Sequence, residues 1–202
     1  MSANSYEELN ALVRERIIIL DGAMGSMLKG HKLSDPLCLS NPELIASVHE
    51  AYLEAGADII TTCSFNANAV SLSDHGLAEK AYEVSRAAGT VARQAADKFS
   101  ASGKRRFVAG SMGPMTKSAS MASDLNDLGK RCISWDEIEA AYYDNARGLL
   151  DGGVDILLLE TIFDTLNAKA GIAAVIRLRE ERKARIPLMI SATVSDAAGR
   201  LL

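Results

Sequence analysis

The sequence lacks the features that mark several large classes of protein. No apolar run approaches the ~18 residues of a membrane-spanning helix. The polar, acidic start also has no basic stretch followed by an apolar one, as a secretory signal would. The net charge of −4 gives no indication of polyanion binding. Residues 104–106 (Lys-Arg-Arg) are the densest basic run, and we interpret them as a solvated loop before a strand. We expect neither a membrane nor a nucleic-acid partner.

Cysteine is also scarce, with three residues at wide spacing. An odd, scattered set argues against a disulfide framework and suits a reducing cytoplasm. There is no Cys-x-x-Cys and no His–Cys pair with metal-ligand spacing. Residues 110–113 lack the dinucleotide fingerprint, and no phosphate-binding loop occurs. Redox, structural-zinc and nucleotide-binding classes therefore have no motif in their favour.

An alternation of strands and helices organises the whole chain. Apolar runs predict strands at 17–20, 58–62, 107–110, 155–160 and 188–193. Periodicity and capping residues predict helices at 1–15, 42–55, 78–100, 135–151 and 164–184. The segments 26–41, 63–76 and 111–127 are predicted to be loops. At 202 residues the chain fits one domain, residues 1–202.

Uninterrupted apolar strands joined by helices predict an α/β fold with a parallel sheet. The units at 55–62 and 152–160 repeat a short glycine stop, an aspartate and a strand. This repetition is typical of a (β/α)8 TIM-type barrel, of which five βα units are counted here. The expectation is therefore an open five-stranded sheet or, as the abrupt end favours, the N-terminal part of a longer barrel protein.

Polar residues follow the carboxyl end of every predicted strand, where α/β enzymes bind ligands. The first strand delivers Asp21 and then the Gly22–Ala23 loop, and the fourth delivers Glu160. Two carboxylates could clamp an ammonium group while loop amides hold a carboxylate, which together would read an α-amino acid. They could instead be a general acid and base, or simply accept hydrogen bonds from loop amides. The other strand ends supply Thr61, Thr62, Cys63, Ser64, Asn66, Ser111, Gly113, Pro114, Thr161, Ser191, Thr193 and Asp196.

Cys63 alone among the cysteines lies at a strand exit. A thiolate nucleophile there would need a nearby base, and His75 is in the same loop region without anything to fix it close. A zinc site made by Cys38, Cys63 and Cys132 is conceivable but disfavoured. A buried, unreactive thiol is the default interpretation.

Several stretches together resemble a known family. They are 20–25 (Leu-Asp-Gly-Ala-Met-Gly), 54–62, 64–66 (Ser-Phe-Asn), 113–114, 118–120 and 159–169 (Leu-Glu-Thr-Ile-Phe-Asp-Thr-Leu-Asn-Ala-Lys). These resemble the homocysteine-binding domain of cobalamin-dependent methionine synthases, within the homocysteine S-methyltransferases. The match runs from about residue 8 to the end. The stretch 160–169, with 190–193 and 196–200, is typical of the methionine synthase branch.

The resemblance implies a (β/α)8 barrel that binds homocysteine and zinc, and methylcobalamin as the methyl donor that converts homocysteine to methionine. In that reaction, zinc would lower the pKa of the homocysteine thiol. Carried onto this chain, Asp21 and Glu160 would hold the substrate ammonium. Amides at Gly22, Ala23 and around Ser64 would hold its carboxylate, and Asn66 would support that rim.

The sequence departs from the family in its cysteines. The family's three zinc-ligating cysteines lie in later strands, and none of them is present here, so Cys63 is not assigned as a ligand. The cobalamin and folate modules are absent as well. We therefore expect the isolated chain to be inactive. Two alternatives stay open: a cobalamin-independent methyltransferase using a sulfonium or betaine donor, and a non-catalytic half-barrel binding fragment.

Overall fold

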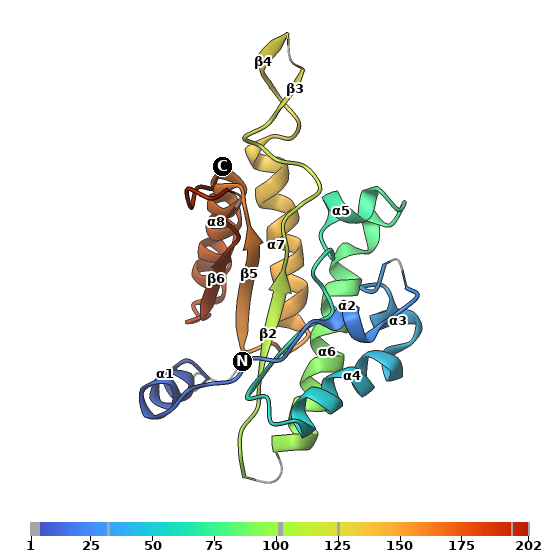
Figure 1. The fold of residues 1–202 in the computed structure, drawn as a ribbon, viewed down its shortest axis with the longest axis vertical. Coiled ribbons are helices and arrows are strands. Elements are labelled where there is room, and N and C mark those ends of the chain that lie inside the picture. Colours follow the sequence, from blue (N-terminus) through green and yellow to red (C-terminus); the bar gives the residue numbers. More distant parts are fainter. Residues whose placement is uncertain (1–4, 32, 101–102, 125, 195, 202) are drawn as a thin grey trace.

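The computed structural model describes residues 5–31, 33–100, 103–124, 126–194 and 196–201, which form an α/β fold (Figure 1). A parallel sheet carries helices on its outer face, and a separate hairpin projects beyond one end. The elements in chain order are α1 (Ser5–Glu15), α2 (Met24–Met27), α3 (Leu37–Ser40), α4 (Pro42–Glu54), β1 (Ile59–Thr61), α5 (Ala69–Ser73), the 3-10 helix η1 (Ala78–Lys80), α6 (Ala81–Ser100), β2 (Phe107–Met112), β3 (Ala122–Asp124), β4 (Asp127–Arg131), α7 (Trp135–Asp151), β5 (Ile156–Ile162), α8 (Thr165–Arg182) and β6 (Leu188–Ala192).

The main sheet has the order β1-β2-β5-β6, and each neighbouring pair is parallel. The register places Thr61 beside Ala109 and Ser111 beside Leu158. All four strands therefore end at the same edge of the sheet, toward the top of Figure 1. This edge is where the candidate site is built.

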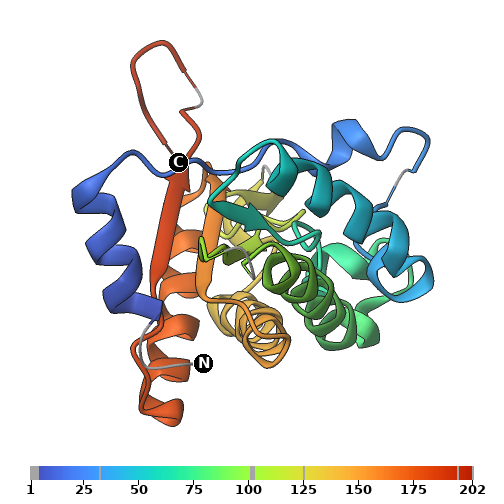
Figure 2. The same cartoon turned by 90° about the horizontal axis from the view of Figure 1, so that it is seen from below.

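Alternate residues of the strands enter two separate apolar clusters, as a sheet buried on both faces requires. Ile60, Val108 and Leu157 face the cluster shared with the covering helices. Their neighbours Ile59, Phe107 and Ile156 face the other side, where α1 supplies Leu9 and Leu12. Figure 2 shows α6, α7 and α8 along one side of the sheet and α1 apart from them.

Two aspartates hold the amino ends of the strands, and they explain the repeated motif of the sequence. Asp58 accepts a hydrogen bond from the backbone of Ile19 (3.0 Å) and forms an ion pair with Arg16. Asp155 in the same way accepts from the backbone of Val108 (3.0 Å) and pairs with Arg93. Each aspartate thus ties the start of its own strand to the neighbouring segment.

The prediction of a regular strand at 17–20 is wrong. The segment is reduced to one parallel bridge between Leu20 and Ile59. Its side chains explain this, because Ile17 is 87% exposed and Ile19 57%, so little apolar burial favours extended pairing on this side. The segment nevertheless lies beside β1, where the Asp21 amide donates to the Ile59 carbonyl (3.0 Å).

The three predicted loops also contain regular structure. Helices α2 and α3 interrupt 26–41, and α5 interrupts 63–76, where the Asn68 side chain caps it by accepting from Ser71 (2.8 Å). The segment 111–127 leads into the antiparallel hairpin of β3 and β4. These elements are only three to five residues long, so no periodic pattern could indicate them.

The long helices agree with the predictions, and so do the four strands of the sheet. Asn41 and Ser134 cap α4 and α7, and Ser134 forms the expected capping box with Glu137. The helix predicted at 1–15 begins at Ser5, since residues 1–4 lie outside the described part of the chain. No helix among the described residues is long and apolar enough to cross a membrane.

His49 is the one histidine of the described chain that is buried, at 0% exposure on α4. Neither ring nitrogen has a hydrogen-bond partner among the described residues. Burial lowers the pKa of its imidazole to about 4, because the cation would lose its hydration. His49 is therefore neutral in the folded protein at every pH near neutrality.

We expect the free energy of unfolding to fall as the pH drops below about 6.5. In this range His49 takes up a proton in the unfolded chain but stays neutral in the folded protein. The loss due to this group should reach about 2 kcal/mol between pH 7.5 and 5. Urea unfolding of His49→Leu across this range should show a correspondingly flatter profile. The exposed His75→Leu variant is the control, and equal slopes for both variants would contradict the expectation.

Candidate functional site

A pocket of about 500 Å³ opens at the carboxyl ends of β1, β2 and β5. It is lined by Leu20, Asp21, Gly22, Ala23, Met24, Gly25, Ser34, Asp35, Thr61, Thr62, Cys63, Ser64, Phe65, Asn66, Ser111 and Glu160. All six residues predicted to bind substrate are in this set. Ser191, Thr193 and Asp196, which follow the last predicted strand, are not.

Asp21 is held over the end of β1. Its carboxylate accepts hydrogen bonds from the backbone N–H of Thr61 (2.8 Å) and from the Thr61 hydroxyl (3.0 Å). Burial raises the pKa of Asp21 to about 6, with the negative charge of Glu160 adding to the rise and Thr61 opposing it. Asp21 is thus ionised at neutral pH and lies close enough to Glu160 to sense its charge.

Glu160 lies near the end of β5 and faces the same pocket. The Ser111 hydroxyl, from β2, donates to Oε1 of Glu160. Oε2 accepts no hydrogen bond from the described residues. Ser111 therefore orients this carboxylate and leaves one oxygen to receive a donor from a ligand.

The residue after Glu160 has a strained backbone. Thr161 has φ of 59°, in the left-handed region that β-branched residues rarely adopt. The pairing of β5 with β6 shifts register between Leu159 and Ile162, which marks a β-bulge. Bulges redirect side chains next to binding sites, and this one sets where Glu160 points. Nothing in the sequence indicated it.

Three buried residues close a ring of hydrogen bonds beneath the pocket. The Ser111 N–H donates to Oγ1 of Thr62 (2.9 Å), and the Ser64 hydroxyl donates to the Ser111 carbonyl (2.7 Å). Because the Ser64 proton is used in that bond, the Thr62 hydroxyl donates to Oγ of Ser64 (2.6 Å). The ring joins the exit of β1 to β2 and leaves the Ser64 side chain no proton for a ligand.

The N–H groups available to an anion are those of Cys63 and Phe65, on either side of Ser64, and not that of Ser64 itself. The Ser64 N–H donates to the Thr62 carbonyl (2.9 Å), whereas those of Cys63 and Phe65 reach no acceptor in the described part of the chain. The same holds for Gly22 and Ala23 on the facing loop. The pocket therefore offers free N–H donors from two loops.

Tyr52 of α4 fixes the Gly22–Ala23 loop. Its hydroxyl donates to the Ala23 carbonyl (3.1 Å). A Cβ at Gly22 would lie 2.9 Å from that hydroxyl oxygen, so a larger residue would displace the Tyr52 side chain. Tyr52 was not predicted from the sequence, because nothing in a helical tyrosine indicates which loop it will meet.

Asp35 is a second residue that the sequence did not indicate. It falls in the segment 26–41, which is predicted to be a loop, yet it is 1% exposed and lines the pocket. Its Oδ1 accepts from the Asn66 N–H (2.7 Å), and Oδ2 has no partner among the residues described. Burial raises the pKa of Asp35, while the bonds from Asn66 oppose the rise. Asn66 thus supports the rim through its backbone.

The cysteines do not assemble a metal centre. Cys38 and Cys63 are buried, whereas Cys132 is exposed. Among the described residues, no group of three His, Cys, Asp or Glu side chains could hold a metal ion. His75 is exposed and does not line the pocket, so it is not positioned as a base for Cys63.

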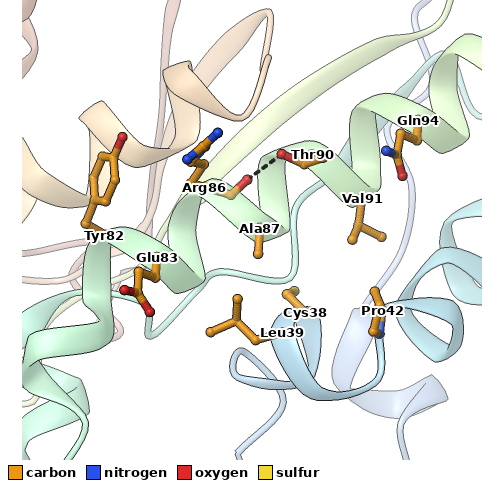
Figure 3. A pocket seen from close by; sticks show the side chains of 10 residues that line it. All are labelled: Cys38, Leu39, Pro42, Tyr82, Glu83, Arg86, Ala87, Thr90, Val91 and Gln94. Carbon is orange, nitrogen blue, oxygen red and sulfur yellow. Dashed lines mark hydrogen bonds between the residues drawn. The ribbon is translucent and has the colours of Figure 1, made fainter.

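A second hollow, of about 550 Å³, lies on the outer side of the molecule (Figure 3). Its walls are α6 on one side and α3 with the start of α4 on the other. It is lined by none of the predicted site residues. The pocket at the strand ends is therefore the candidate functional site.

The hydrogen-bonded ring yields a stability prediction. Thr62→Val removes the hydroxyl but keeps the shape, leaving the Ser111 N–H and the Ser64 oxygen without their partner in a buried place. We expect a loss of about 1–3 kcal/mol in the free energy of unfolding, measured by urea titration. Thr165→Val, at an exposed position, is the matched control. Equal losses in the two variants would refute a role for the ring.

Comparison with known proteins agrees with this architecture. The homocysteine S-methyltransferase family model matches residues 18–202. The metallated form of the homocysteine methyltransferase MmuM from Escherichia coli is 28% identical with a TM-score of 0.73, over 93% of this chain and 67% of its own. The oxidised form gives a TM-score of 0.74, over 96% of this chain and 69% of its own. The chain thus spans about two thirds of the length of MmuM. It belongs to the homocysteine S-methyltransferase family.

Proposed function

We propose that the pocket at the strand ends binds homocysteine, and that this chain is the homocysteine-binding part of a methionine synthase. Asp21 and Glu160 would hold the ammonium group of the amino acid. The free N–H groups of Gly22 and Ala23, with those beside Ser64, would hold its carboxylate. Membership of the family supports homocysteine as the substrate.

One observation carries this proposal. Asp21, Glu160 and free backbone N–H donors line a single pocket. An α-amino acid presents an ammonium group to such carboxylates and a carboxylate to such N–H groups. Ser111 leaves one oxygen of Glu160 open, and Asp21 is ionised at neutral pH because its pKa stays near 6. Without a cation between them, the two negative charges repel, which is what raises the pKa of Asp21 further. A ligand ammonium group would relieve that repulsion.

The methyl donor is proposed from the sequence. Residues 160–169, 190–193 and 196–200 resemble the cobalamin-dependent branch, so methylcobalamin is the donor we propose, with a TIM-type barrel as the complete fold. The alternative is a sulfonium or betaine donor, because membership of the homocysteine S-methyltransferase family does not specify the donor. Methyl transfer assayed with each donor class separates the two.

Metal activation of the homocysteine thiol is not assigned to residues of this chain. One E. coli neighbour is a metallated form. The residues described here do not fit such a site, since no three metal-binding side chains meet among them. We therefore assign to this chain only the binding and orientation of the amino acid.

The proposal predicts that homocysteine binding depends on both carboxylates. Isothermal calorimetry under reducing conditions should show binding to the wild-type chain. Asp21→Asn or Glu160→Gln should weaken it about tenfold or more, since a charged hydrogen bond contributes about 1.5–3 kcal/mol. Affinity should also fall as the pH drops below about 6, where Asp21 takes up a proton.

Asp196→Asn is the matched control, because Asp196 is an exposed carboxylate outside the pocket that pairs with Arg200. It should leave affinity unchanged. The pH dependence should disappear in Asp21→Asn. If folded Asp21→Asn and Glu160→Gln both bind as well as the wild type, or if the wild type binds no homocysteine, the proposal is wrong.

A second prediction concerns metal. Zinc sites need three or four protein ligands, and the described residues offer no such group. We expect the isolated chain to bind no stoichiometric zinc tightly and to transfer no methyl group. Competition with a chromophoric chelator measures the first, with metallated MmuM as positive control. One tightly bound equivalent of zinc, with turnover, would overturn the expectation.

A further inference from the structure

Cys38 and Cys63 lie against each other although 25 positions separate them. The Cys38 thiol donates to the Cys63 carbonyl at 3.4 Å, which brings the two residues into contact. Each residue is 3% exposed, and both belong to one apolar cluster. Cys38 is on α3, and Cys63 follows β1, so the pair joins the same two segments that the Asp35–Asn66 hydrogen bond connects.

The pair also stands between the two hollows of the molecule. Cys38 lines the outer hollow, where Figure 3 shows it facing α6. Cys63 lines the pocket at the strand ends. Each hollow is therefore lined by one residue of the pair, although both residues are largely shielded from bulk water.

The two thiols differ in what they face. The contact with Cys63 and burial together raise the pKa of the Cys38 thiol, so Cys38 stays protonated near neutral pH. An electrophile that enters the strand-end pocket meets Cys63, because Cys63 lines that pocket and Cys38 does not. Cys38 is then adjacent to complete a disulfide, and Cys132 is distant on the exposed hairpin side.

We propose that Cys38 and Cys63 are an oxidisable pair that forms an intramolecular disulfide when a peroxide enters the strand-end pocket. The Cys63 thiolate attacks hydrogen peroxide, giving a sulfenic acid and hydroxide, which takes up the proton that left Cys63. The Cys38 sulfur then attacks the Cys63 sulfur, and its proton leaves with the hydroxyl group as water. One peroxide is reduced to two waters, and two thiols are oxidised to one disulfide.

The bond would tie α3 to the exit of β1, on the wall of the pocket. Oxidation would link this wall covalently and close a loop across α4 and β1. A disulfide across a loop of this size restricts the unfolded chain, so the melting temperature should rise by several degrees. Dithiothreitol should reverse both the bond and the rise.

Peptide mapping of the full chain after peroxide treatment tests the proposal. Residues 33–79 contain no Lys or Arg, so trypsin leaves both cysteines in one peptide. Cleavage after Glu43, Glu50 and Glu54 separates them. The protein is reduced, exposed to hydrogen peroxide, alkylated and digested without reductant. We expect a linked Cys38–Cys63 peptide pair and one alkylated thiol, at Cys132.

The matched variants are Cys38→Ala, Cys63→Ala and Cys132→Ala. The first two should give no intramolecular disulfide, whereas Cys132→Ala should form it at the wild-type rate. Cys38→Ala should accumulate the sulfenic acid at Cys63, trapped by dimedone, which confirms the order of attack. The proposal fails if peroxide oxidises Cys132 while Cys38 and Cys63 stay reduced in the folded wild type, or if the disulfides formed involve Cys132.

Discussion

The common end point of β1, β2 and β5 is the constraint on which the rest of the molecule depends. Parallel pairing in one register brings Thr62 and Ser111 to the same edge, where the Thr62–Ser64–Ser111 ring joins them. Ser111 then reaches Glu160 on the next strand. Asp21 is positioned separately, by two hydrogen bonds from Thr61. Asp21, Ser111 and Glu160 are therefore placed by the sheet, whereas the Gly22–Ala23 loop is fixed by Tyr52 of α4.

An aspartate lies at each end of β1, and the two have opposite electrostatic environments. Asp58, at the amino end, is saturated by Arg16 and Lys104, and the hydrogen bond from Arg16 holds its pKa well below the usual range. Asp21, at the other end, has no cationic partner among the described residues, and burial raises its pKa to about 6. A carboxylate already neutralised by the protein stabilises the fold. One left without a counter-ion is available to a ligand.

Local signals in the sequence were enough to predict the long elements and the place of the site. Asn41 and Ser134 start helices by capping them, which depends on neighbours within three residues. Parallel strands end at one edge by topology, so Asp21 and Glu160 could be assigned to one rim without coordinates. The contacts that define the site in detail are long-range. The Tyr52 hydroxyl donates to the Ala23 carbonyl, and the Asn66 N–H donates to the Asp35 carboxylate. Each bond joins segments about thirty residues apart. Ser64 lines the pocket, but its hydroxyl donates to the Ser111 carbonyl on the neighbouring strand β2.

The β-bulge after Leu159 shows how the strain at the site is sustained. Three positions of β5, from Leu159 to Ile162, pass two of β6, from Ile190 to Ala192. In a regular strand Leu159 and Ile162 would face opposite sides, but the extra residue returns both to the cluster shared with the helices. A left-handed Thr161 costs about 1–2 kcal/mol, and burying Ile162 contributes about 1.5–3 kcal/mol.

Burial of Ile162 is therefore of the size needed to offset the strain at Thr161. Glu160 lies on the bulge beside Thr161, with a leucine buried before it and an isoleucine after it. The packing that holds those two apolar side chains in the core is what keeps a charged residue at the edge of the sheet, where Ser111 can orient it.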